Sequence, residues 1–327
     1  MRAKTGSARG QLLFGKLVLI YQMPKVGSQT IEATLRHYPL GYRIYRFHFL
    51  SGAFAKTLRR GLTADQPDPA WKQDAQKQLD SMRTISRALR IRRFLSFCGV
   101  NIPKLHVITG VREVISLALA SIFENDLCFA PEPESMTPEK CREALLHPKT
   151  FKTLKNWFDL ELRPFIGVDV YGAGFPHEEG YAVYENHFAR VLVYRFEAFE
   201  RLRTLLAKFL HRNIPRLVNF DLGEAKEYGV QYHSVRKALK LPPEFVASLY
   251  DCRMMRHFYS ENERDRWHAR WTGLDLEQSL GEPKSPVKAR AGSETKNCHF
   301  LADASTSAKG LHRDISSTHE RQPPSGG

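Results

Sequence analysis

A lysine, a glycine and several hydroxyl-bearing residues follow directly after an apolar run near the start of the chain. The run KLVLIYQM covers residues 16–23, and PKVGSQT covers residues 24–30. Gly27 would allow the backbone to approach an anion, and the N–H groups that open a following helix would point at that anion. Lys25 would add a positive charge, and the hydroxyl groups would add donors. The spacing predicts a phosphate-binding loop, while a plain strand-to-helix turn with a surface lysine is the alternative.

The lysine stands in a different place from the lysine of nucleotide-hydrolysing P-loops. A Walker loop reads G-x-x-x-x-G-K-[ST], with the lysine and a metal-binding hydroxyl at the start of the helix. Here Lys25 comes before Gly27, and Ser28 follows. This order disfavours a P-loop kinase or another NTPase. It indicates an anion site without an evident metal ligand.

Three segments resemble the cofactor-binding elements of sulfotransferases. PKVGSQT resembles the 5′-phosphosulfate loop, P-K-x-G-[ST]-x-[TS], which grips the 5′ end of 3′-phosphoadenosine 5′-phosphosulfate (PAPS). TGVREVISLALASIFEN, residues 109–125, is similar to the 3′-phosphate segment, a strand that ends in an arginine and an acid and continues into a helix. Arg112 and Glu113 stand where that pair should be, and Phe123 fits the family's aromatic residue. VLVYRFEAFERL, residues 191–202, resembles a later strand-to-helix element.

More narrowly, segments between residues 17 and 272 are similar to bacterial proteins described as capsular polysaccharide synthesis proteins, which have sulfotransferase-like features. These segments are QMPKVGSQT, HFL, TGVRE…SIFEN, WFDLELRPFIGVDVYGAGFP and HFYSENE. The resemblance implies an α/β fold of three layers, P-loop-like, with a central parallel sheet flanked by helices. It also implies an enzyme that transfers a sulfuryl group from PAPS to a hydroxyl or amine of a glycan or small-molecule acceptor, in capsular or surface polysaccharide synthesis, without a metal.

The sequence departs from the sulfotransferase pattern at three expected positions. Val114, Leu117 and Ala120 stand where the family has a proline, a second arginine and a serine. The lost hydroxyl would weaken a phosphate site by on the order of 1–3 kcal/mol. Ser121 is expected to supply that hydroxyl, and Ser116 is a turn away. The donor-binding residues that the resemblance implies are Lys25, Gly27, Ser28, Gln29, Thr30, Arg112 and Ser121.

Lys25 and His48 are the expected catalytic residues. Lys25 would neutralise charge on the bridging oxygen of the leaving phosphate and later protonate it, since positioning and electrostatics supply most of the catalysis. His48 ends the second predicted strand, on the side where the loops of parallel sheets gather ligands, and histidine can act as a base near neutral pH. Its alternative role is a strand histidine with a backbone hydrogen bond. Glu32, one turn into the loop's helix, is the competing base.

Other functions stay open beside this one. The missing serine and the unassigned base favour a non-catalytic relative of sulfotransferases that binds a nucleotide or a partner. The arginine-rich stretch 83–93 could guide an anionic acceptor or PAPS, although such a run is more often a solvated helix face. Nucleic-acid binding is not expected, because the sequence has neither aromatic platforms among its basic residues nor a known binding module.

A parallel sheet is needed to bring these residues together. Apolar and alternating runs predict strands at 16–23, 42–50 and 104–113, with a strand-helix pair across 189–210. Helices are predicted after the first strand, with Ser28 as N-cap, across most of 54–99, over 115–125, and from 151 as far as Pro164. The alternation of strands and helices is typical of an α/β layer fold.

The composition is ordinary for a globular protein of 327 residues, with 42% hydrophobic and 26% charged residues. We expect a flexible basic N-terminus over 1–15, a sulfotransferase-like domain over 16–274, and a disordered tail over 275–327, where apolar clusters are scarce. The net charge of +14 points to anionic partners, which include nucleic acid, a phosphorylated cofactor, an acidic glycan and a membrane surface, and the charge alone does not choose among them.

The cysteines and the hydropathy of the sequence indicate the cellular compartment in which the protein is expected. Five cysteines without C-x-x-C spacing argue against a disulfide framework and against a zinc site. No apolar run reaches the roughly 18–20 residues that a membrane span needs. A cytoplasmic protein is expected, and peripheral association with a membrane is left open.

Overall fold

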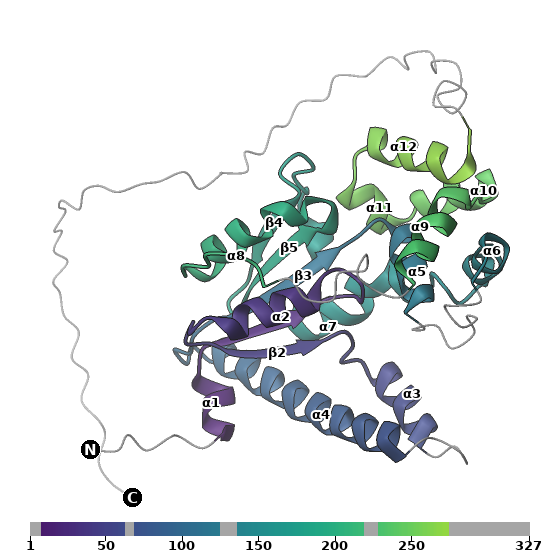
Figure 1. The fold of residues 1–327 in the computed structure, drawn as a ribbon. Helices are drawn as coiled ribbons and strands as arrows, with labels where there is room; N and C mark the ends of the chain where they lie inside the picture. The colour runs from purple at the N-terminus through teal and green to yellow at the C-terminus, as the bar shows by residue number, and fades with distance from the viewer. Residues whose placement is uncertain (1–7, 63–68, 125–135, 219–227, 275–327) are drawn as a thin grey trace, which may run out of the picture. The chain divides into compact units, whose positions relative to one another are not determined.

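A five-stranded sheet lies at the centre of the computed structural model, which describes residues 8–62, 69–124, 136–218 and 228–274 (Figure 1). The strand order is β2-β1-β3-β5-β4, and every neighbouring pair is parallel except β4 with β5. The strands are β1 (Leu17–Tyr21), β2 (Arg43–Phe47), β3 (Leu105–Val111), β4 (Tyr181–Glu185) and β5 (Ala189–Arg195). This arrangement confirms the predicted α/β class with a central parallel sheet.

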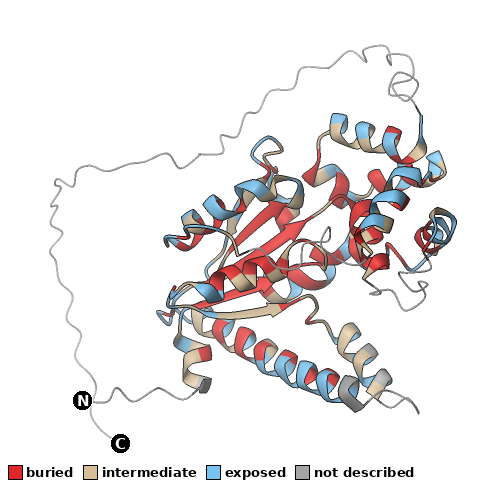
Figure 2. Cartoon of the chain, viewed as in Figure 1, coloured by how far each residue is buried: buried red, intermediate tan, exposed pale blue. Residues whose placement is uncertain are grey.

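The central strands are buried because helices cover both faces of the sheet. Val18 and Ile20 of β1 belong to a core shared with α2 (Ser28–His37) and α8 (Leu202–Leu210). Leu17, Leu19 and Tyr21 belong to a second core, shared with α4 (Pro69–Phe97) and α7 (Arg163–Ile166). Successive residues of one strand thus point into opposite layers. Figure 2 shows buried residues along the strands β1, β3 and β5 and on the inward faces of these helices, whereas β2 is mostly half-buried.

The remaining helices complete the layers and add a helical region after the sheet. They are α1 (Ala8–Phe14), α3 (Gly52–Leu62), α5 (Val114–Phe123), α6 (Pro138–Leu146), α9 (Gly229–Ala238), α10 (Pro243–Tyr250), α11 (Arg253–Phe258) and α12 (Glu261–Thr272). A capping box opens α12, in which Ser260 and Glu263 bond to each other's backbone N–H groups, and Gly273 ends the helix with φ 77°.

The helix predicted to end at Pro164 continues beyond it. Residues 158–162 form a π-helix that leads into α7, and the left-handed Gly167 (φ 72°) ends that helix. Pro164 is tolerated because it stands in the first turn of α7, where a backbone N–H is not needed. Strand β4 was not predicted, because its apolar run is only four residues long and no member of the strand is fully buried.

Residues 8–14, within the segment expected to be flexible, form α1. The buried guanidinium of Arg92 donates from Nη1 to the carbonyl oxygens of Leu13 (2.6 Å) and Gly15 (3.2 Å), and so ties α1 to α4. Residues 1–7 and the predicted tail, 275–327, lie outside the described residues. Within the described ranges, no helix has both the length and the apolar character needed to cross a membrane.

Candidate anion-binding site at the ends of β1 and β3

The two predicted phosphate-binding segments meet at one point of the sheet. From β1 the chain builds outward to β2 on one side and to β3 on the other, so the strand order reverses between β1 and β3. Ligands of open parallel sheets bind in the crevice outside the carboxyl ends of the strands at such a reversal. The loop with Lys25 follows β1, and Arg112 follows β3. The topology therefore brings these two predicted residues to the expected place.

The loop from Gln22 to Gly27 is held in an uncommon conformation. Lys25 has φ 60° and Gly27 has φ 85°, both in the left-handed region. Nη1 of Arg112 donates to the carbonyl oxygen of Lys25 at 3.0 Å, and the Tyr194 hydroxyl donates to the carbonyl oxygen of Val26. A non-glycine residue with positive φ costs on the order of 1–3 kcal/mol and is typical of ligand clamps.

Gly27 is required for steric reasons as well as for its conformation. A Cβ atom at position 27 would lie 2.3 Å from Cε2 of Phe199. Gly27 is also the N-cap of α2, and Ser28 is the first helical residue, so the prediction of Ser28 as N-cap is wrong. The left-handed glycine takes the cap position because the chain must turn sharply there. Ser28 and Thr30 are buried and Gln29 is half-buried beside this turn.

The ammonium group of Lys25 forms an ion pair with Glu124, the residue that ends α5. The two side chains are 14% and 25% exposed, respectively, so the pair is only partly screened by water. Glu124 thus offers a carboxylate to the cation that was predicted to hold a phosphate. An anionic ligand of Lys25 would have to compete with this carboxylate.

Arg112 lies beside a cavity of about 250 Å³. Its guanidinium stacks on the ring of Phe196, 4.4 Å from the ring centroid. The cavity is lined by Arg112, Glu113, Ser116, Phe196, Glu197, Arg236 and Trp267. Two guanidinium groups, a hydroxyl and two aromatic rings thus converge on one space, together with the carboxylates of Glu113 and Glu197. Neither Arg236 in α9 nor Trp267 in α12 was predicted at this site, because Arg236 has no informative spacing and the spacing of Trp267 from Trp271 indicates a helix-packing residue.

Ser121 does not line this cavity. Its Oγ donates to the carbonyl oxygen of Leu117 at 3.1 Å, and the residue is 2% exposed in the core. Ser116 lines the cavity instead. Ser116 and Ser121 are five positions apart, about 140° around an α-helix, so both cannot face the same ligand. The hydroxyl beside Arg112 is therefore that of Ser116.

Glu113 caps α5 rather than contributing to a cationic site. Its carboxylate accepts hydrogen bonds from the backbone N–H groups of Ile115 and Ser116, each at 2.8 Å, and from the Tyr250 hydroxyl at 2.9 Å. The first turn of α5 therefore already has its anion. Binding of a further anion in the cavity would depend on the guanidinium groups and the Ser116 hydroxyl.

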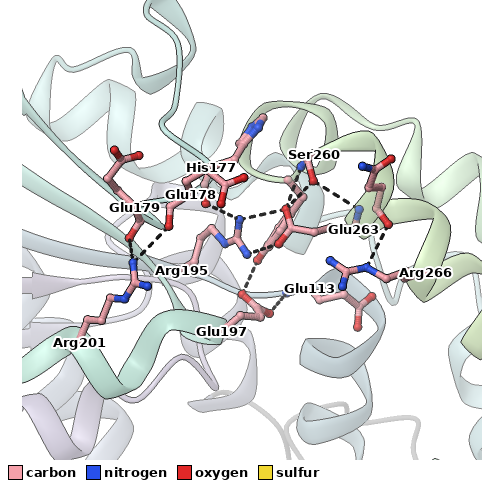
Figure 3. Close-up of polar contacts among 12 residues, drawn as sticks. Glu113, His177, Glu178, Glu179, Arg195, Glu197, Arg201, Ser260, Glu263 and Arg266 are labelled. Carbon is pink, nitrogen blue, oxygen red and sulfur yellow. Dashed lines mark hydrogen bonds and ion pairs between the residues drawn. The ribbon is translucent and has the colours of Figure 1, made fainter.

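A buried polar network connects the end of β3 to β5 and α12 (Figure 3). Glu197 accepts from the backbone N–H of Glu113 at 2.8 Å and from the Tyr259 hydroxyl at 2.9 Å. Burial raises the pKa of Glu197 above its usual value. Arg195 forms a two-contact ion pair with Glu263, whose pKa is lowered because the bonds from Arg195 outweigh the effect of burial. The network fixes the turn that carries Arg112.

His48 lies just past β2, with both ring nitrogens in contact with polar groups. Nδ1 is 2.9 Å from the carbonyl oxygen of Gln22, which can only accept, so Nδ1 carries the proton and Nε2 is the basic nitrogen. Nε2 lies 3.4 Å from Nη1 of Arg46. His48 can therefore take a proton only when the Arg46 guanidinium turns aside. The residue shares the strand-end region with the Lys25 loop, since Gln22 opens that loop.

Glu32 is held by two arginines. Its carboxylate accepts from Nε of Arg36 at 3.0 Å and from Nε of Arg46. Burial alone would raise the pKa of Glu32, but the bonds from Arg46 and Arg36 outweigh burial and lower it. A carboxylate with a lowered pKa is a weak base at neutral pH, so the geometry favours His48 over Glu32 in that role.

Two residues of the helical segment 154–166 position the turn that carries His48. The indole Nε1 of Trp157 donates to the carbonyl oxygen of His48 at 2.9 Å. The buried carboxylate of Glu161 accepts from the Tyr21 hydroxyl at 2.7 Å and from the backbone N–H groups of Leu50 and Ser51 at 2.8 and 3.0 Å. Neither residue was predicted to act at the site.

Within the described ranges, no group of three or more His, Cys, Asp or Glu residues could hold a metal ion.

One family model matches part of the chain. Residues 141–260 match the family described as NKWYS, "Putative capsular polysaccharide synthesis protein". The matched region runs from α6 to the residue before α12, and contains Trp157, Glu161 and Glu197. It lies C-terminal to both Lys25 and Arg112. Comparisons with curated proteins and with solved structures give no match.

Proposed function

We propose that this protein is a sulfotransferase that transfers the sulfuryl group of PAPS to a hydroxyl or amine of a glycan, or of a small-molecule acceptor, in capsular polysaccharide synthesis. The observation that carries the proposal is the bond from Arg112 to the carbonyl oxygen of Lys25 at 3.0 Å. This bond places two phosphate-binding candidates side by side at the point of the sheet where α/β proteins bind nucleotides.

The residues present fit a nucleotide that carries two separate phosphate groups. Lys25 and the start of α2 suit the 5′ group, because a cation and a helix N-terminus both favour an anion. Arg112, Arg236 and the Ser116 hydroxyl suit the 3′-phosphate, since guanidinium groups can bind phosphate bidentately. The cavity that these three residues share with two aromatic rings has a volume of about 250 Å³.

Each residue has a defined part in the proposed reaction. PAPS, when bound, supplies a sulfuryl group on a phosphate leaving group. Nε2 of His48 would take the proton of the acceptor as the acceptor atom bonds to sulfur. Lys25 would offset the charge that develops as the bond between sulfur and the bridging phosphate oxygen breaks, and would then protonate that oxygen. Arg112 would hold the donor without taking part in proton transfer.

The acceptor class rests on the family match. The matched family is described by capsular polysaccharide synthesis, and a polysaccharide or its precursors offer many hydroxyl groups and some amines. The exposed basic side chains of a chain with net charge +14 also suit an acceptor that carries carboxylates. We therefore propose an acidic or amino-bearing glycan before a neutral one.

A transfer assay tests the proposal. Purified protein is incubated with PAPS and a panel of acidic, amino-bearing and neutral oligosaccharides, and the desulfated nucleotide and the sulfated product are both measured. Product is expected with wild type and Ser121→Ala, and at least about a hundredfold less with Lys25→Ala and His48→Ala. Absence of product over the whole panel, or equal product in Lys25→Ala, would contradict the proposal.

A non-catalytic nucleotide-binding protein is the second candidate. Two observations favour it, namely the ion pair of Lys25 with Glu124 and the contact of His48 Nε2 with Arg46. Each group that would act in the transfer already has a partner. Lys25 pairs with a carboxylate of opposite charge, and Nε2 of His48 faces the Arg46 guanidinium, which opposes its protonation. This candidate predicts that the desulfated nucleotide binds wild type but that no acceptor yields product.

A further inference from the structure

We propose that the outer face of α4 and the adjoining end of α1 form a docking surface for an anionic phospholipid membrane. The inference does not depend on the proposed function. It rests on a stripe of exposed side chains along α4, which we call the α4 stripe: Arg83, Arg87, Arg90, Phe94 and Phe97. Their spacing of four, three, four and three residues places them on one side of the helix.

The stripe is exposed because the opposite side of α4 faces the core. Met82, Ile85 and Leu89 are buried there, together with Arg92. Phe94 is 65% exposed and Phe97 is 80% exposed, values that are unusual for large aromatic side chains. Figure 2 shows the exposed side of α4 along its length. Apart from an edge contact between the rings of Phe97 and His187, with centroids 6.5 Å apart, the two phenylalanine rings lie outside the core of the described fold.

Two further apolar residues lie at the same end of the helix. Phe14, the last residue of α1, is 54% exposed, and Val100 is 41% exposed. Arg92 joins their segments to α4, since its guanidinium donates to the carbonyl oxygens of Leu13 and Pro103. Phe14, Phe94, Phe97 and Val100 thus form an apolar end that is fixed in place by one buried cation.

The charge around this end is mostly positive. From Ser81 to Lys104 the sequence contains six basic residues and no acidic residue. Arg83 is partly neutralised by Asp80, and Lys104 by Glu185, while Arg87, Arg90 and Arg93 lie exposed on α4 between them. Exposed arginines next to exposed aromatic rings suit a partner that is anionic at its surface and apolar beneath it.

An anionic bilayer meets both requirements. Lipid phosphates would contact the guanidinium groups, and the phenylalanine rings would enter the boundary between headgroups and acyl chains. The apolar end lies near the start of β3, whereas Lys25 and Arg112 follow the carboxyl ends of their strands. Docking through the apolar end would therefore leave the candidate anion site facing the aqueous side, open to a substrate.

Flotation of the full chain with lipid vesicles tests the docking surface. The vesicles contain phosphatidylcholine alone or a mixture with about one third phosphatidylglycerol, at low and at high salt. Wild type is expected to float with the anionic vesicles at low salt and to be released at high salt, because screening weakens charge contacts. The variants Phe94→Ser/Phe97→Ser and Arg87→Glu/Arg90→Glu should each lower the partition coefficient by about tenfold or more.

Matched substitutions elsewhere serve as controls. Val230 is 85% exposed in α9, and Lys237 and Arg266 are exposed in α9 and α12. Val230→Ser and Lys237→Glu/Arg266→Glu remove the same kinds of group without touching α4, and should float as wild type does. Equal loss in these controls would show that only total charge or total hydrophobicity matters, and would overturn the proposal.

A second measurement does not depend on disruptive variants. Phe97→Trp places a fluorophore on the apolar end, and lipids brominated on their acyl chains quench a tryptophan that enters the bilayer. Quenching beyond that of the wild-type tryptophans is expected. Failure of wild type to bind anionic vesicles, or Phe97→Trp emission unaffected by brominated lipid, would overturn the proposal. So would sedimentation that shows wild type as a dimer and Phe94→Ser/Phe97→Ser as a monomer, since the surface would then bind a second copy.

Discussion

Nη1 of Arg112 lies 3.0 Å from the carbonyl oxygen of Lys25, and this bond joins the ends of the two central strands β1 and β3. The two residues are 87 positions apart in the sequence, yet one bond fixes the distance between their segments. The conformation of the loop and the position of the guanidinium are therefore coupled. Loss of the Arg112 guanidinium is therefore expected to weaken the binding of a nucleotide at both of its phosphate groups, whereas Lys25→Ala keeps the carbonyl oxygen and removes only the ammonium group.

Gly27→Ala should destabilise the fold and abolish nucleotide binding. The new Cβ would lie 2.3 Å from the Phe199 ring at φ 85°, so both backbone and ring must move. We expect a loss of about 2–4 kcal/mol in the free energy of unfolding, measured with urea. Gly41→Ala is the control, because Gly41 has φ 74° but open space around it, and should cost only about 1–2 kcal/mol. Equal costs at the two positions would refute the steric account.

Glu124→Gln should raise the affinity for an anionic nucleotide. The substitution removes the carboxylate that pairs with Lys25, so the ligand no longer competes with it. A gain of about three- to tenfold is expected in the dissociation constant measured by calorimetry. Glu143→Gln, an exposed change in α6, is the control and should leave affinity unchanged. A lower affinity in Glu124→Gln would mean that the pair holds the lysine in its binding position.

Ser116→Ala should weaken nucleotide binding, whereas Ser121→Ala should leave it unchanged. Ser116 lines the cavity beside Arg112, and loss of its hydroxyl is expected to weaken nucleotide binding by about tenfold or more. The Ser121 hydroxyl bonds within α5, to the carbonyl oxygen of Leu117, so its loss should change stability by less than about 1 kcal/mol and leave affinity unchanged. Titration of both variants with the desulfated nucleotide decides between them, and a reversed order would restore the assignment of Ser121.

The stability of the fold should fall with acid because of His106. Burial, and then the nearby Arg190 and His211, lower the pKa of His106 to about 4. The unfolded chain binds a proton near pH 6.5, so stability is fully present above that pH and is lost as pH falls towards 4. We expect about 2 kcal/mol of loss, given the partial exposure of the ring. In His106→Gln, urea unfolding should lack this component, and an unchanged pH profile would contradict the assignment.

The four parallel strands of the sheet and the two halves of the candidate site could be predicted from local patterns, whereas β4 could not. Val18 and Ile20 sit in an apolar run that only a doubly covered strand explains, and Lys25 and Arg112 each follow such a run. The direction of side chains within a helix was harder to predict. Ser116 and Ser121 lie five positions apart in α5, yet only Ser116 lines the cavity, while the Ser121 hydroxyl bonds inside the helix.

Contacts between elements that are distant in the sequence could not be predicted from local patterns either. Arg236 and Trp267 lie on separate helices, and nothing in their neighbours in the sequence indicates that they reach the same cavity as Arg112. The ion pair of Lys25 with Glu124 depends on where α5 ends in space, which no local spacing encodes. Helices α9 and α12 were not predicted, because their mostly polar segments show no clear apolar stripe.

Calorimetric titration with 3′-phosphoadenosine 5′-phosphate tests the central claim most directly, because it asks whether Lys25 and Arg112 form one clamp for a nucleotide with two phosphate groups. Wild type is expected to bind, and Arg43→Ala, an exposed change at the start of β2, should bind equally well. Lys25→Ala and Arg112→Ala should each weaken binding by about a hundredfold. No heat with wild type, or undiminished binding in both variants, would contradict the account.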